Sequence, residues 1–467
     1  MTTDIKFRPT PSYSIRDTTF ENPALKRNYT SQFNNIYKYR STTLKPRIFK
    51  LAHQKWTTTT INNEKPVYIS KILDVQAQKA CFMIGTIFCE MKYKPDVLKE
   101  VELAVQGHSE ILNDEGLSKL EILRRKAYSD PAKDEIWLED ESGRILITGW
   151  EGVLVTGLVV GVLGMEIESG VFHVVDVMFP EAAPQSPLPT VHSNDKKNVL
   201  IVSGFNINEE SDRLKLELLK QWIMGDLGDP KAQEIESVYI LGNLTWSLHK
   251  KRILNEKQKY AENFNSTYDK EAISYIDDWI SQVCHSCPVT IMPGDSDVVE
   301  KAWPKQPIHH SLLPQSTSRN NFTSLTNPSW INIENVRMLA TSGENVADIT
   351  RYIIPNLKSN GPMDESIYQE RLGLLEDMML WQNIAPTAPD TLWCYPYEDS
   401  DPFTLKETPH IYVVGNQPKF ESSLVYLKRK DDSTATVRVL AVPEFSESGQ
   451  CVILNAATQK CHLLNII

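Results

Sequence analysis

Residues 198–206 read NVLIVSGFN, a short apolar run that ends in a glycine and a polar loop, Ser203-Gly204-Phe205-Asn206. Similar runs, closed by comparable loops, return along the chain at Gly242-Asn243-Leu244, Pro293-Gly294-Asp295-Ser296-Asp297, Ser342-Gly343-Glu344 and Gly415-Asn416-Gln417-Pro418. Helix-like segments lie between the runs, at residues 212–224, 256–283 and 364–381. This alternation predicts a layered α/β domain, whose ligands would bind beyond the carboxyl ends of the strands.

The region before this domain has a different pattern, with short strand-like runs and no helical spacing. The runs are ACFMIGTIFCEM, DEIWLEDESGRILITG, LVTGLVVGVLGME and VFHVVDVMF, and Glu141-Ser142-Gly143-Arg144 is typical of a hairpin turn. A long polar stretch interrupts them from Lys99 to Lys133. Four or five short strands of this kind predict a small Greek-key barrel of the OB type. The Pro-rich stretch FPEAAPQSPLPTVHSNDKKN that follows predicts a linker.

Near the N-terminus, apolar residues recur close to helical spacing from about Thr30 to Trp56. Pro46 should kink or split this helix, because proline has no N–H group to donate. We therefore predict three regions: a helical, basic segment at 1–65, an OB-fold domain at 66–183 and an α/β domain at 184–467.

The charge of the chain is uneven. Residues 1–65 hold 12 basic and 4 acidic residues, whereas residues 66–183 hold 11 and 20, and residues 184–467 hold 26 and 36. The acidic body would repel phosphates, which opposes single-strand binding by the aromatic residues of the barrel, Trp137, Phe82, Phe88 and Tyr93. The basic helix has two interpretations, contact with DNA or docking on the acidic body, and we favour docking.

Seven scattered cysteines indicate free thiols, and the sequence has neither an apolar leader nor a run long enough to span a membrane. We therefore expect an intracellular protein. Cys284 and Cys287 form an isolated C-x-x-C without further zinc ligands nearby, so we interpret them as two unrelated thiols. His309 and His310 lie in a Pro-rich loop, where a structural role is favoured over metal binding.

The order of the glycine-ended loops resembles that of the calcineurin-like metallophosphoesterases, in which Asp, His and Asn side chains of these loops hold two metal ions. The glycines are present here, but the ligands that the resemblance implies are replaced, at Gly204, Asn206, Asn243, Asp295, Ser296, Asn416 and Pro418. The resemblance therefore implies a phosphodiesterase-like domain that is inactive, with no cofactor, rather than a residually active enzyme. Asp295 and Asp297 could keep a loosely held Mg²⁺ or Ca²⁺ or, as we favour, cap the turn.

A degenerate phosphoesterase domain joined to an OB barrel is similar to the B-subunit family, the accessory subunits of replicative DNA polymerases, and most of all to its polymerase delta branch of fungal type. The segments that carry this similarity are SQFNNIYKYR, CFMIGTIFCEMKYKP, DEIWLEDESGRI, IMPGDSDVVEKAWPKQPIHHSLLP, TSGENVADITRY, WQNIAPTAPDTLWCYPYEDSDPF and HIYVVGNQPKF.

The similarity implies a nuclear, non-catalytic scaffold in DNA replication and repair. Such a scaffold grips the cysteine-rich C-terminal domain of the catalytic subunit of polymerase delta and holds the third subunit. It is also expected to serve polymerase zeta in translesion synthesis, with DNA contacted mainly through the complex. The family further suggests that N-terminal residues pack on the phosphoesterase-like domain.

One aromatic cluster has two open interpretations. Trp381, Trp393, Tyr395, Tyr397 and Phe403 lie in or beside a Pro-rich loop. Aromatic residues in such a loop could form an interface with a partner, or could fasten the loop to the core of its own domain.

Overall fold

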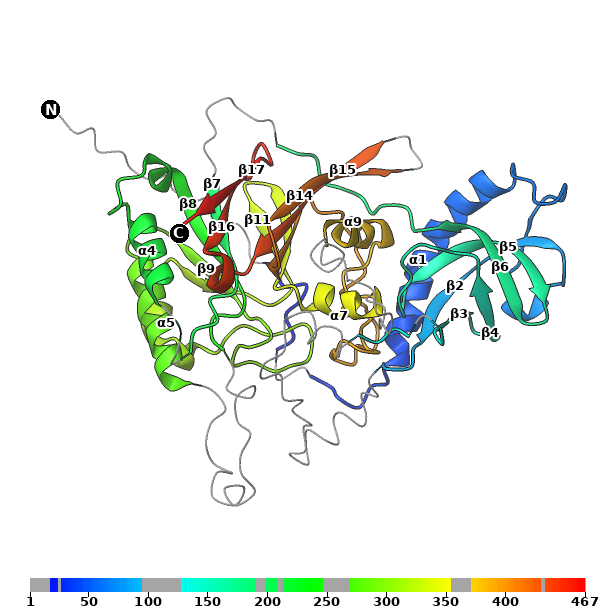
Figure 1. Cartoon of the computed structure of the whole chain (residues 1–467), viewed down its shortest axis with the longest axis horizontal. Coiled ribbons are helices and arrows are strands. Elements are labelled where there is room, and N and C mark those ends of the chain that lie inside the picture. Colours follow the sequence, from blue (N-terminus) through cyan, green and yellow to red (C-terminus); the bar gives the residue numbers. More distant parts are fainter. Residues whose placement is uncertain are drawn as a thin grey trace, which may run out of the picture.

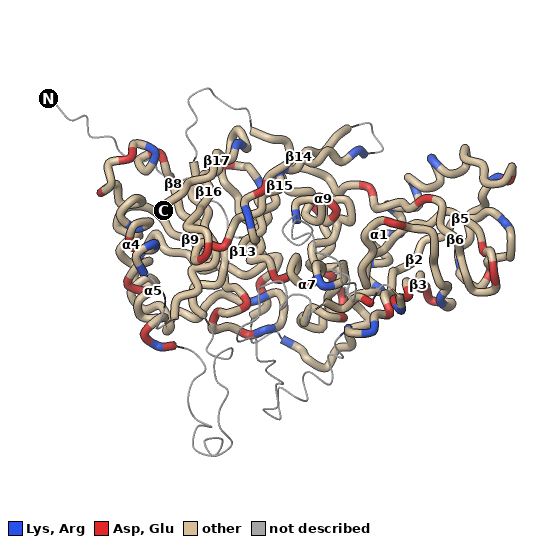
Figure 2. The backbone as a smooth tube through the Cα atoms, in the orientation of Figure 1, with Lys and Arg blue, Asp and Glu red and all other residues tan. Residues whose placement is uncertain are grey.

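The computed structural model describes residues 17–23, 27–94, 127–130, 132–189, 198–208, 211, 213–246, 269–353, 371–429 and 433–466. They form a small β-barrel with a long helix on its surface, and a larger α/β part beside it (Figure 1). Acidic and basic residues are interspersed along both parts (Figure 2). Within the described ranges, no helix combines the length and apolar character needed to cross a membrane.

Six strands form the barrel in the order β1-β2-β3-β4-β6-β5, and a pairing between β2 and β5 closes it. The predicted hairpin turn joins β3 to β4, where the Asp140 carboxylate accepts hydrogen bonds from the N–H groups of Ser142 (2.7 Å) and Gly143 (3.1 Å). The hairpin prediction is therefore confirmed. The strands are β1 (Val67–Tyr68), β2 (Ala80–Glu90), β3 (Glu135–Glu139), β4 (Arg144–Thr148), β5 (Val159–Glu168) and β6 (Val171–Met178), with a short 3₁₀ helix η2 (Ile72–Asp74) after β1.

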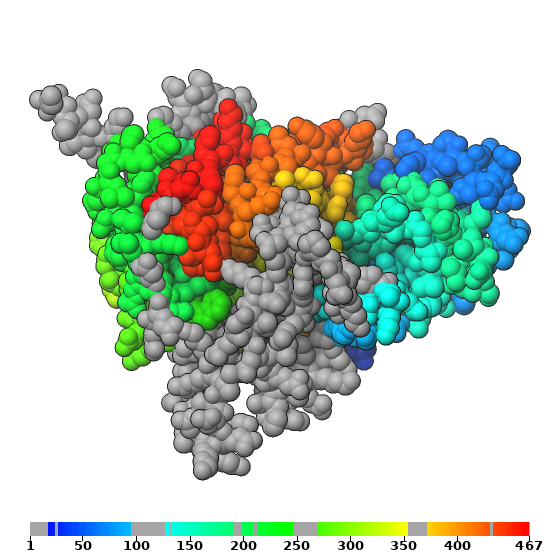
Figure 3. Space-filling model, viewed as in Figure 1, coloured from blue at the N-terminus to red at the C-terminus, as the bar shows by residue number. Residues whose placement is uncertain are grey.

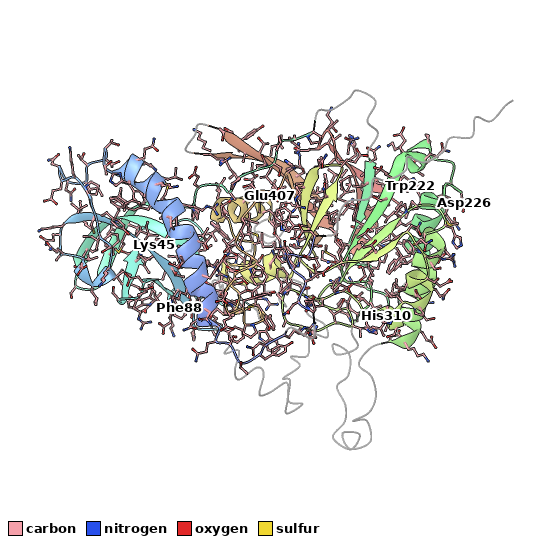
Figure 4. All side chains as sticks on the ribbon, turned by 180° about the vertical axis from the view of Figure 1, so that it is seen from behind. Lys45, Phe88, Trp222, Asp226, His310 and Glu407 are labelled. Carbon is pink, nitrogen blue, oxygen red and sulfur yellow. The ribbon has the colours of Figure 1, made fainter. Side chains whose placement is uncertain are left out.

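Helix α1 (Asn34–Trp56) lies along the barrel, as Figure 4 shows at the position of Lys45. Its buried residues recur every fourth position: Ile36, Arg40, Leu44, Ile48, Ala52 and Trp56. They pack on outward-facing residues of β2, such as Phe82 and Ile84, while Cys81 and Met83 point into the barrel. Strand β2 is thus buried on both faces, which explains its unbroken apolar sequence.

The prediction that Pro46 splits this helix is wrong, because α1 continues through it as one element. A proline at this position leaves the carbonyl oxygen of Thr42 without its helical N–H donor. Both Pro46 and Thr42 are exposed, so water can bind that oxygen and the cost of the proline stays small.

Two sheets, of six and five strands, form the α/β part, in the orders β10-β9-β8-β7-β16-β17 and β11-β12-β13-β15-β14. The first sheet consists of β7 (Asn198–Val202), β8 (Ile235–Leu241), β9 (Val289–Met292), β10 (Phe322–Ser324), β16 (Gln450–Asn455) and β17 (Cys461–Asn465), and the second of β11 (Ser329–Ile333), β12 (Val336–Thr341), β13 (Ile411–Gln417), β14 (Glu421–Lys428) and β15 (Thr434–Pro443). Strands β7, β8, β9 and β10 run parallel, as do β12, β13 and β15.

The two sheets enclose an apolar core between them, and helices cover their outer faces (Figure 1). Helices α4 (Leu214–Met224) and α5 (Lys270–Val283) pack on the first sheet, while α7 (Glu344–Ile353) and α9 (Leu372–Trp381) cover the second. The remaining short helices are α6 (Pro314–Thr317), α10 (Phe445–Ser448), η3 (Pro230–Glu234) and η5 (His310–Leu312). The layered α/β prediction is therefore confirmed.

The predicted helices at 256–283 and 364–381 correspond to α5 and α9, but residues 256–268 and 364–370 lie outside the described residues. Most of the predicted polar stretch from Lys99 to Lys133 also lies outside them. Helix α7 and strands β10, β11, β14, β16 and β17 were not predicted.

The N-terminal segment and the linker are both attached to the α/β part. Phe20 is buried, the Asn22 N–H donates to Gln306 (2.8 Å), and Asp17 pairs with Arg337 (2.8 Å). In the linker, the Gln185 amide donates to the carbonyl oxygens of Pro409 (2.9 Å) and Thr436 (2.8 Å). The boundaries at residues 65 and 183 remain predictions.

Candidate functional site

The predicted loops come together at the carboxyl ends of the strands of the two sheets. The Gly204 N–H donates to the Gly242 carbonyl oxygen (3.1 Å), and the Asn206 N–H donates to that of Asn243 (2.9 Å). The Asn416 N–H, from the second sheet, donates to Ser203 Oγ (2.8 Å). The loops after β7 and β8 and the carboxyl end of β13 thus form one connected surface.

Glycine is required where these loops touch. A Cβ atom on Gly294 would lie 2.2 Å from Asn243 Oδ1, and one on Gly204 would lie 2.6 Å from Asn416 Oδ1. Because these distances are far below van der Waals contact, a larger residue would force the loops apart. The glycines that the sequence retains therefore keep the loops in contact.

The asparagines at the predicted ligand positions bind the protein itself. The Asn416 amide group donates to the carbonyl oxygens of Leu241 (3.0 Å) and Ser342 (2.7 Å). Asn243 Oδ1 accepts from the Ser296 N–H (3.2 Å), and the Asn206 amide donates to Glu444 and Ser446. Asn206, Asn243 and Asn416 have φ angles of 48°, 55° and 55°, a left-handed conformation that asparagine tolerates better than most residues.

A lysine that the sequence did not single out lies among the loops. Lys305 Nζ donates to the Gly294 carbonyl oxygen (3.1 Å) and pairs with Glu344 (3.1 Å) and Asp295 (3.6 Å). Its side chain is 1% exposed. Burial alone would lower the pKa of Lys305, but attraction by Glu344 and Asp295 outweighs it and raises the pKa. An ammonium group thus joins the loops after β9 and β12.

The two aspartates that could have held a cation have separate roles. Asp297 is buried and accepts hydrogen bonds from the N–H groups of Gly294 (2.7 Å) and Thr245 (3.1 Å), as a turn-capping carboxylate does. Asp295 is 66% exposed and pairs with Lys301 (3.4 Å) as well as Lys305. Ser296 Oγ donates to the Thr245 carbonyl oxygen (2.6 Å). Pro418 is exposed.

This set of side chains does not fit a dinuclear metal centre. Such a centre needs several carboxylate or imidazole ligands around each ion. Within the described ranges, no group of three or more His, Cys, Asp or Glu residues is placed to hold a metal ion. Two cations require acceptor groups and negative charge. Here the Asn416 amide donates to carbonyl oxygens, and a lysine already pairs with the nearby carboxylates.

A second buried charge lies where the barrel meets the α/β part. Arg40, on α1, pairs with Asp401 at 2.8 Å, and both side chains are almost fully buried. The same guanidinium group donates to the carbonyl oxygens of Gly157 (3.1 Å), Pro386 (2.7 Å) and Ala388 (3.1 Å). Gly157 follows β4, whereas the other partners lie in residues 382–410, between α9 and β13, which we call the junction segment.

Further contacts join the same two parts. Arg47 donates to the carbonyl oxygens of Glu181 (2.7 Å) and Leu405 (3.0 Å), and Lys94 pairs with Asp390 (2.8 Å). A single apolar cluster also extends from the barrel interior through the junction segment to the outer face of the second sheet. The barrel and the α/β part are therefore held together by an apolar core with buried polar contacts inside it.

Comparison with known proteins covers both parts of the chain. The DNA polymerase delta subunit OB-fold domain family matches residues 32–177, and the family of the DNA polymerase alpha/epsilon B-subunit matches residues 199–422. The DNA polymerase delta small subunit of Saccharomyces cerevisiae is 35% identical over 94% of this chain and 90% of its own length. The chain belongs to the DNA polymerase delta small-subunit family. The Arabidopsis thaliana family member is 34% identical over 93% of this chain and 91% of its own length. The Drosophila melanogaster member is 30% identical over 94% of this chain and 94% of its own length. The OB type predicted for the barrel agrees with the first of these matches.

The aromatic cluster of this small-subunit family member divides between core and surface. Phe403 and Trp381 are buried, at 0% and 2% exposure, so Phe403 cannot contact a partner directly. Tyr395 is half-buried, and its ring lies 5.3 Å from that of Tyr29 and 5.0 Å from that of Tyr397. For Phe403 and Trp381, fastening to the chain's own core is therefore the better interpretation.

Exposed and half-buried aromatic residues remain where Tyr29, before α1, contacts Tyr395 of the junction segment. Tyr29 is 61% exposed and Phe33 is 47% exposed, while Trp393 and Tyr395 are half-buried. We call these four residues the aromatic patch. The contact between Tyr29 and Tyr395 joins stretches that lie far apart in the sequence, so only the folded chain brings them together.

The aromatic residues of the barrel are mostly covered by the protein itself. Phe82 packs against Trp56 of α1, with ring centroids 5.4 Å apart. Lys94 lies over the Phe88 ring and Arg144 over the Trp137 ring, at 4.3 and 4.5 Å from the centroids.

His309, which the sequence analysis interprets as structural, accepts a hydrogen bond from the Ser311 N–H at the start of η5.

Sequence reasoning missed Arg40, Asp401 and Lys305. Arg40 could have been found, because it occupies a buried position in the four-residue spacing of α1, where a charged residue needs a partner. Lys305 and Asp401 lie in irregular loops, and no periodicity marks them.

Proposed function

We propose that this chain is a non-catalytic accessory subunit of DNA polymerase delta, which joins the cysteine-rich C-terminal domain of the catalytic subunit to the third subunit. The observation that carries the proposal is the 35% identity with the S. cerevisiae small subunit over 94% of the chain. That similarity includes both the barrel and the α/β part, so it concerns the whole architecture and not one module.

The α/β part in this proposal has the calcineurin-like metallophosphoesterase fold without its metal site. The amide groups of Asn416 and Asn206 act as donors inside the protein, Asn243 is a neutral acceptor, and Lys305 supplies positive charge among the loops. A pair of divalent cations there would face the Lys305 ammonium group and too few anionic ligands. The chain therefore contributes no phosphodiester chemistry of its own.

The aromatic patch is the surface that we assign to a partner in the complex. Aromatic residues are enriched among the few side chains that dominate protein–protein binding. Trp393 and Tyr395 remain our candidate partner contacts, together with the exposed residues Tyr29 and Phe33. The Tyr397 ring packs against the Tyr395 ring. We further propose action in the nucleus, a role with polymerase zeta in translesion synthesis, and contact with DNA mainly through the complex.

The test is co-purification with the cysteine-rich C-terminal domain of the polymerase delta catalytic subunit, with size-exclusion chromatography as the readout. We expect a stoichiometric complex that survives several hundred millimolar salt, because its contacts are packed and largely apolar. A folded, monomeric chain that does not bind this domain would refute the proposal.

A matched pair of variants examines the aromatic patch in the same assay. Trp393→Ala combined with Tyr395→Ala should weaken the binding of one partner roughly 30-fold, about 2 kcal/mol. Leu214→Ala, at a residue of α4 that is 57% exposed, is the control and should leave binding unchanged. Equal binding by both variants would remove the patch from the proposal.

A further inference from the structure

Strand β14 forms one edge of the second sheet and is long for an edge strand. It spans Glu421–Lys428, eight residues, and the described segments pair with it only through β15. The other outer strands of the two sheets have three residues (β10) or five (β11 and β17). Its free edge therefore presents the longest row of unpaired N–H and C=O groups in the described sheets.

Soluble proteins usually protect such an edge with a proline, a bulge or a charge in the middle of the strand. β14 has none of these: it contains no proline, its pairing with β15 shows no register shift, and its charged residues stand only at its two ends. Of these two, Glu421 pairs with Lys419 at 3.1 Å. In Figure 3 the β14–β15 region, in orange, reaches the surface along the upper margin.

Apolar side chains line this edge on both faces of the sheet. On one face Tyr426 is 65% exposed and Leu424 is half-buried. On the other face, Glu376 of α9 accepts a hydrogen bond from Ser423 (2.5 Å), and Leu380 lies one helical turn further on, 37% exposed. A strand laid beside β14 would cover apolar surface on both sides.

The charges at this edge differ between the two faces. Arg438 of β15 lies directly opposite Leu424, and within the described ranges it has no carboxylate partner, while its Nε atom is buried without a hydrogen bond. On the α9 face, Glu376 supplies a carboxylate, which accepts the hydrogen bond from Ser423. The edge thus offers a cation, Arg438, on one face and a carboxylate, Glu376, on the other.

We propose that β14 is a docking edge, to which an extended segment of another subunit of the polymerase assembly adds as a further strand. The segment would carry an acidic side chain towards Arg438 and a basic side chain towards Glu376, with apolar residues against Leu424 and Leu380. Main-chain hydrogen bonds give such an added strand its affinity, and the alternating side chains give it specificity. This inference rests on the proposed accessory function and names a second surface, separate from the aromatic patch.

The test compares amide hydrogen exchange of the isolated chain with that of the chain in a complex reconstituted from the polymerase delta catalytic and third subunits. We expect the β14 amides to exchange at least about tenfold more slowly in the complex, because they gain hydrogen bonds. If no complex forms, the proposed function falls together with this inference. If a complex forms and the β14 amides exchange as before, only the docking edge is refuted.

The same exchange experiment would also detect two other possible occupants of the β14 edge. Protection of β14 in the isolated chain that increases with protein concentration would identify a second copy of this chain. Protection that is independent of concentration and already complete in the isolated chain would identify another segment of the same chain. Either result overturns the proposal.

A pair of variants tests the docking edge a second time, through the affinity for a partner and without measuring exchange rates. Tyr426→Lys places a charge in the middle of the edge at a largely exposed position, so the fold should tolerate it while the affinity for one partner falls about tenfold or more. Leu214→Lys, on α4, is the matched control and should bind normally. Normal binding by both variants would refute the docking edge.

Discussion

Arg40 and Lys305 are both buried cations, but they join different things. Arg40 connects α1, the barrel loop at Gly157 and the junction segment through one ion pair and three carbonyl oxygens. Lys305 connects two loops of the α/β part alone, through Glu344, Asp295 and one carbonyl oxygen. One cation therefore joins the barrel to the α/β part, while the other joins loops within the α/β part at the candidate site.

The difference bears on the proposed scaffold function, because the two cations hold together different parts of the chain. In the loops, the Asn416 amide donates to main-chain carbonyl oxygens and Lys305 pairs with Glu344 and Asp295, so these contacts hold the loops to one another. At the junction a guanidinium group, with its fixed fork of donors, suits several carbonyl oxygens from different segments at once. The loop contacts hold the α/β part together internally, whereas the junction contacts fix the barrel against the α/β part.

Arg40→Met should have the largest effect. It removes one half of a buried ion pair, so that Asp401 loses its cation and three carbonyl oxygens lose the Arg40 donor, a class of change that costs about 3–5 kcal/mol. Because the lost contacts bridge the barrel and the α/β part, we expect thermal unfolding to split into two transitions. Differential scanning calorimetry of the variant measures both effects.

Arg40→Lys is the control for this prediction, since it keeps the charge but offers fewer, differently arranged donors. It should recover only part of the loss. A single cooperative transition in Arg40→Met, at a stability close to that of the unchanged chain, would show that the apolar cluster alone holds the junction.

Lys305→Met should cost somewhat less, about 3 kcal/mol, because it leaves Glu344 buried without its cation but affects one domain only. The double variant Lys305→Met with Glu344→Gln should recover most of that loss, since it removes the unpaired charge. Chemical denaturation of the single and double variants measures the difference. Equal stability of Lys305→Met and the unchanged chain would contradict the role given to this lysine.

The same variant has a predicted pH dependence with a defined sign. Burial raises the pKa of Glu344, and loss of the opposing Lys305 charge should raise it further. A carboxyl group whose pKa is raised on folding stabilises the protein below its unfolded-state pKa, and this contribution is lost as pH rises through the folded-state pKa. The deficit of Lys305→Met should therefore be smaller at pH 5 than at pH 8.

The architecture was largely accessible from the sequence, because it follows from repeated local patterns. The runs that became β2, β7, β8, β9, β12, β13 and β15 are apolar and bounded by glycine or polar loops, and such patterns specify strands. Two of the missed strands have weak signals: β14 is half polar, and β17 has only exposed and half-buried residues.

For the candidate site, the sequence predicts only which ligand types are missing. The sequence predicts which loop positions lack metal ligands, since each depends on one residue type at one position. It cannot predict what fills the space, because Lys305 and Glu344 meet only in three dimensions, 39 positions apart in a chain whose intervening segments fold into separate strands. For the same reason Arg40 and Asp401, 361 positions apart, were not paired.

Tyr128→Phe should lower the stability less than the Arg40 and Lys305 variants do, although it also lies near the junction segment. The Tyr128 hydroxyl donates to Asp348 of α7 (3.0 Å) and accepts from Arg351 (3.1 Å). Asp348 also accepts hydrogen bonds from Thr387 and Thr391, so it stays satisfied without the tyrosine. We therefore expect a loss of about 1 kcal/mol and a single unfolding transition, measured by denaturant titration. Two transitions would mean that this contact, and not Arg40 alone, couples the domains.

The smallest expected effect is on catalysis, and it separates the two cations most clearly. Asn243→Asp combined with Asn416→His restores two of the replaced ligands but leaves Gly204, Asn206 and Pro418 unchanged and Lys305 in place. We expect no metal-dependent hydrolysis of a chromogenic phosphodiester by this variant or by the unchanged chain. The histidine should also cost about 1–2 kcal/mol of stability, because Leu241 and Ser342 lose their amide donor. Measurable turnover would mean that two ligands suffice and that Lys305 does not exclude cations from the loops. Turnover that appears only after Lys305→Met is added would instead identify the ammonium group as the remaining barrier, since the loops would then be competent once its charge is gone.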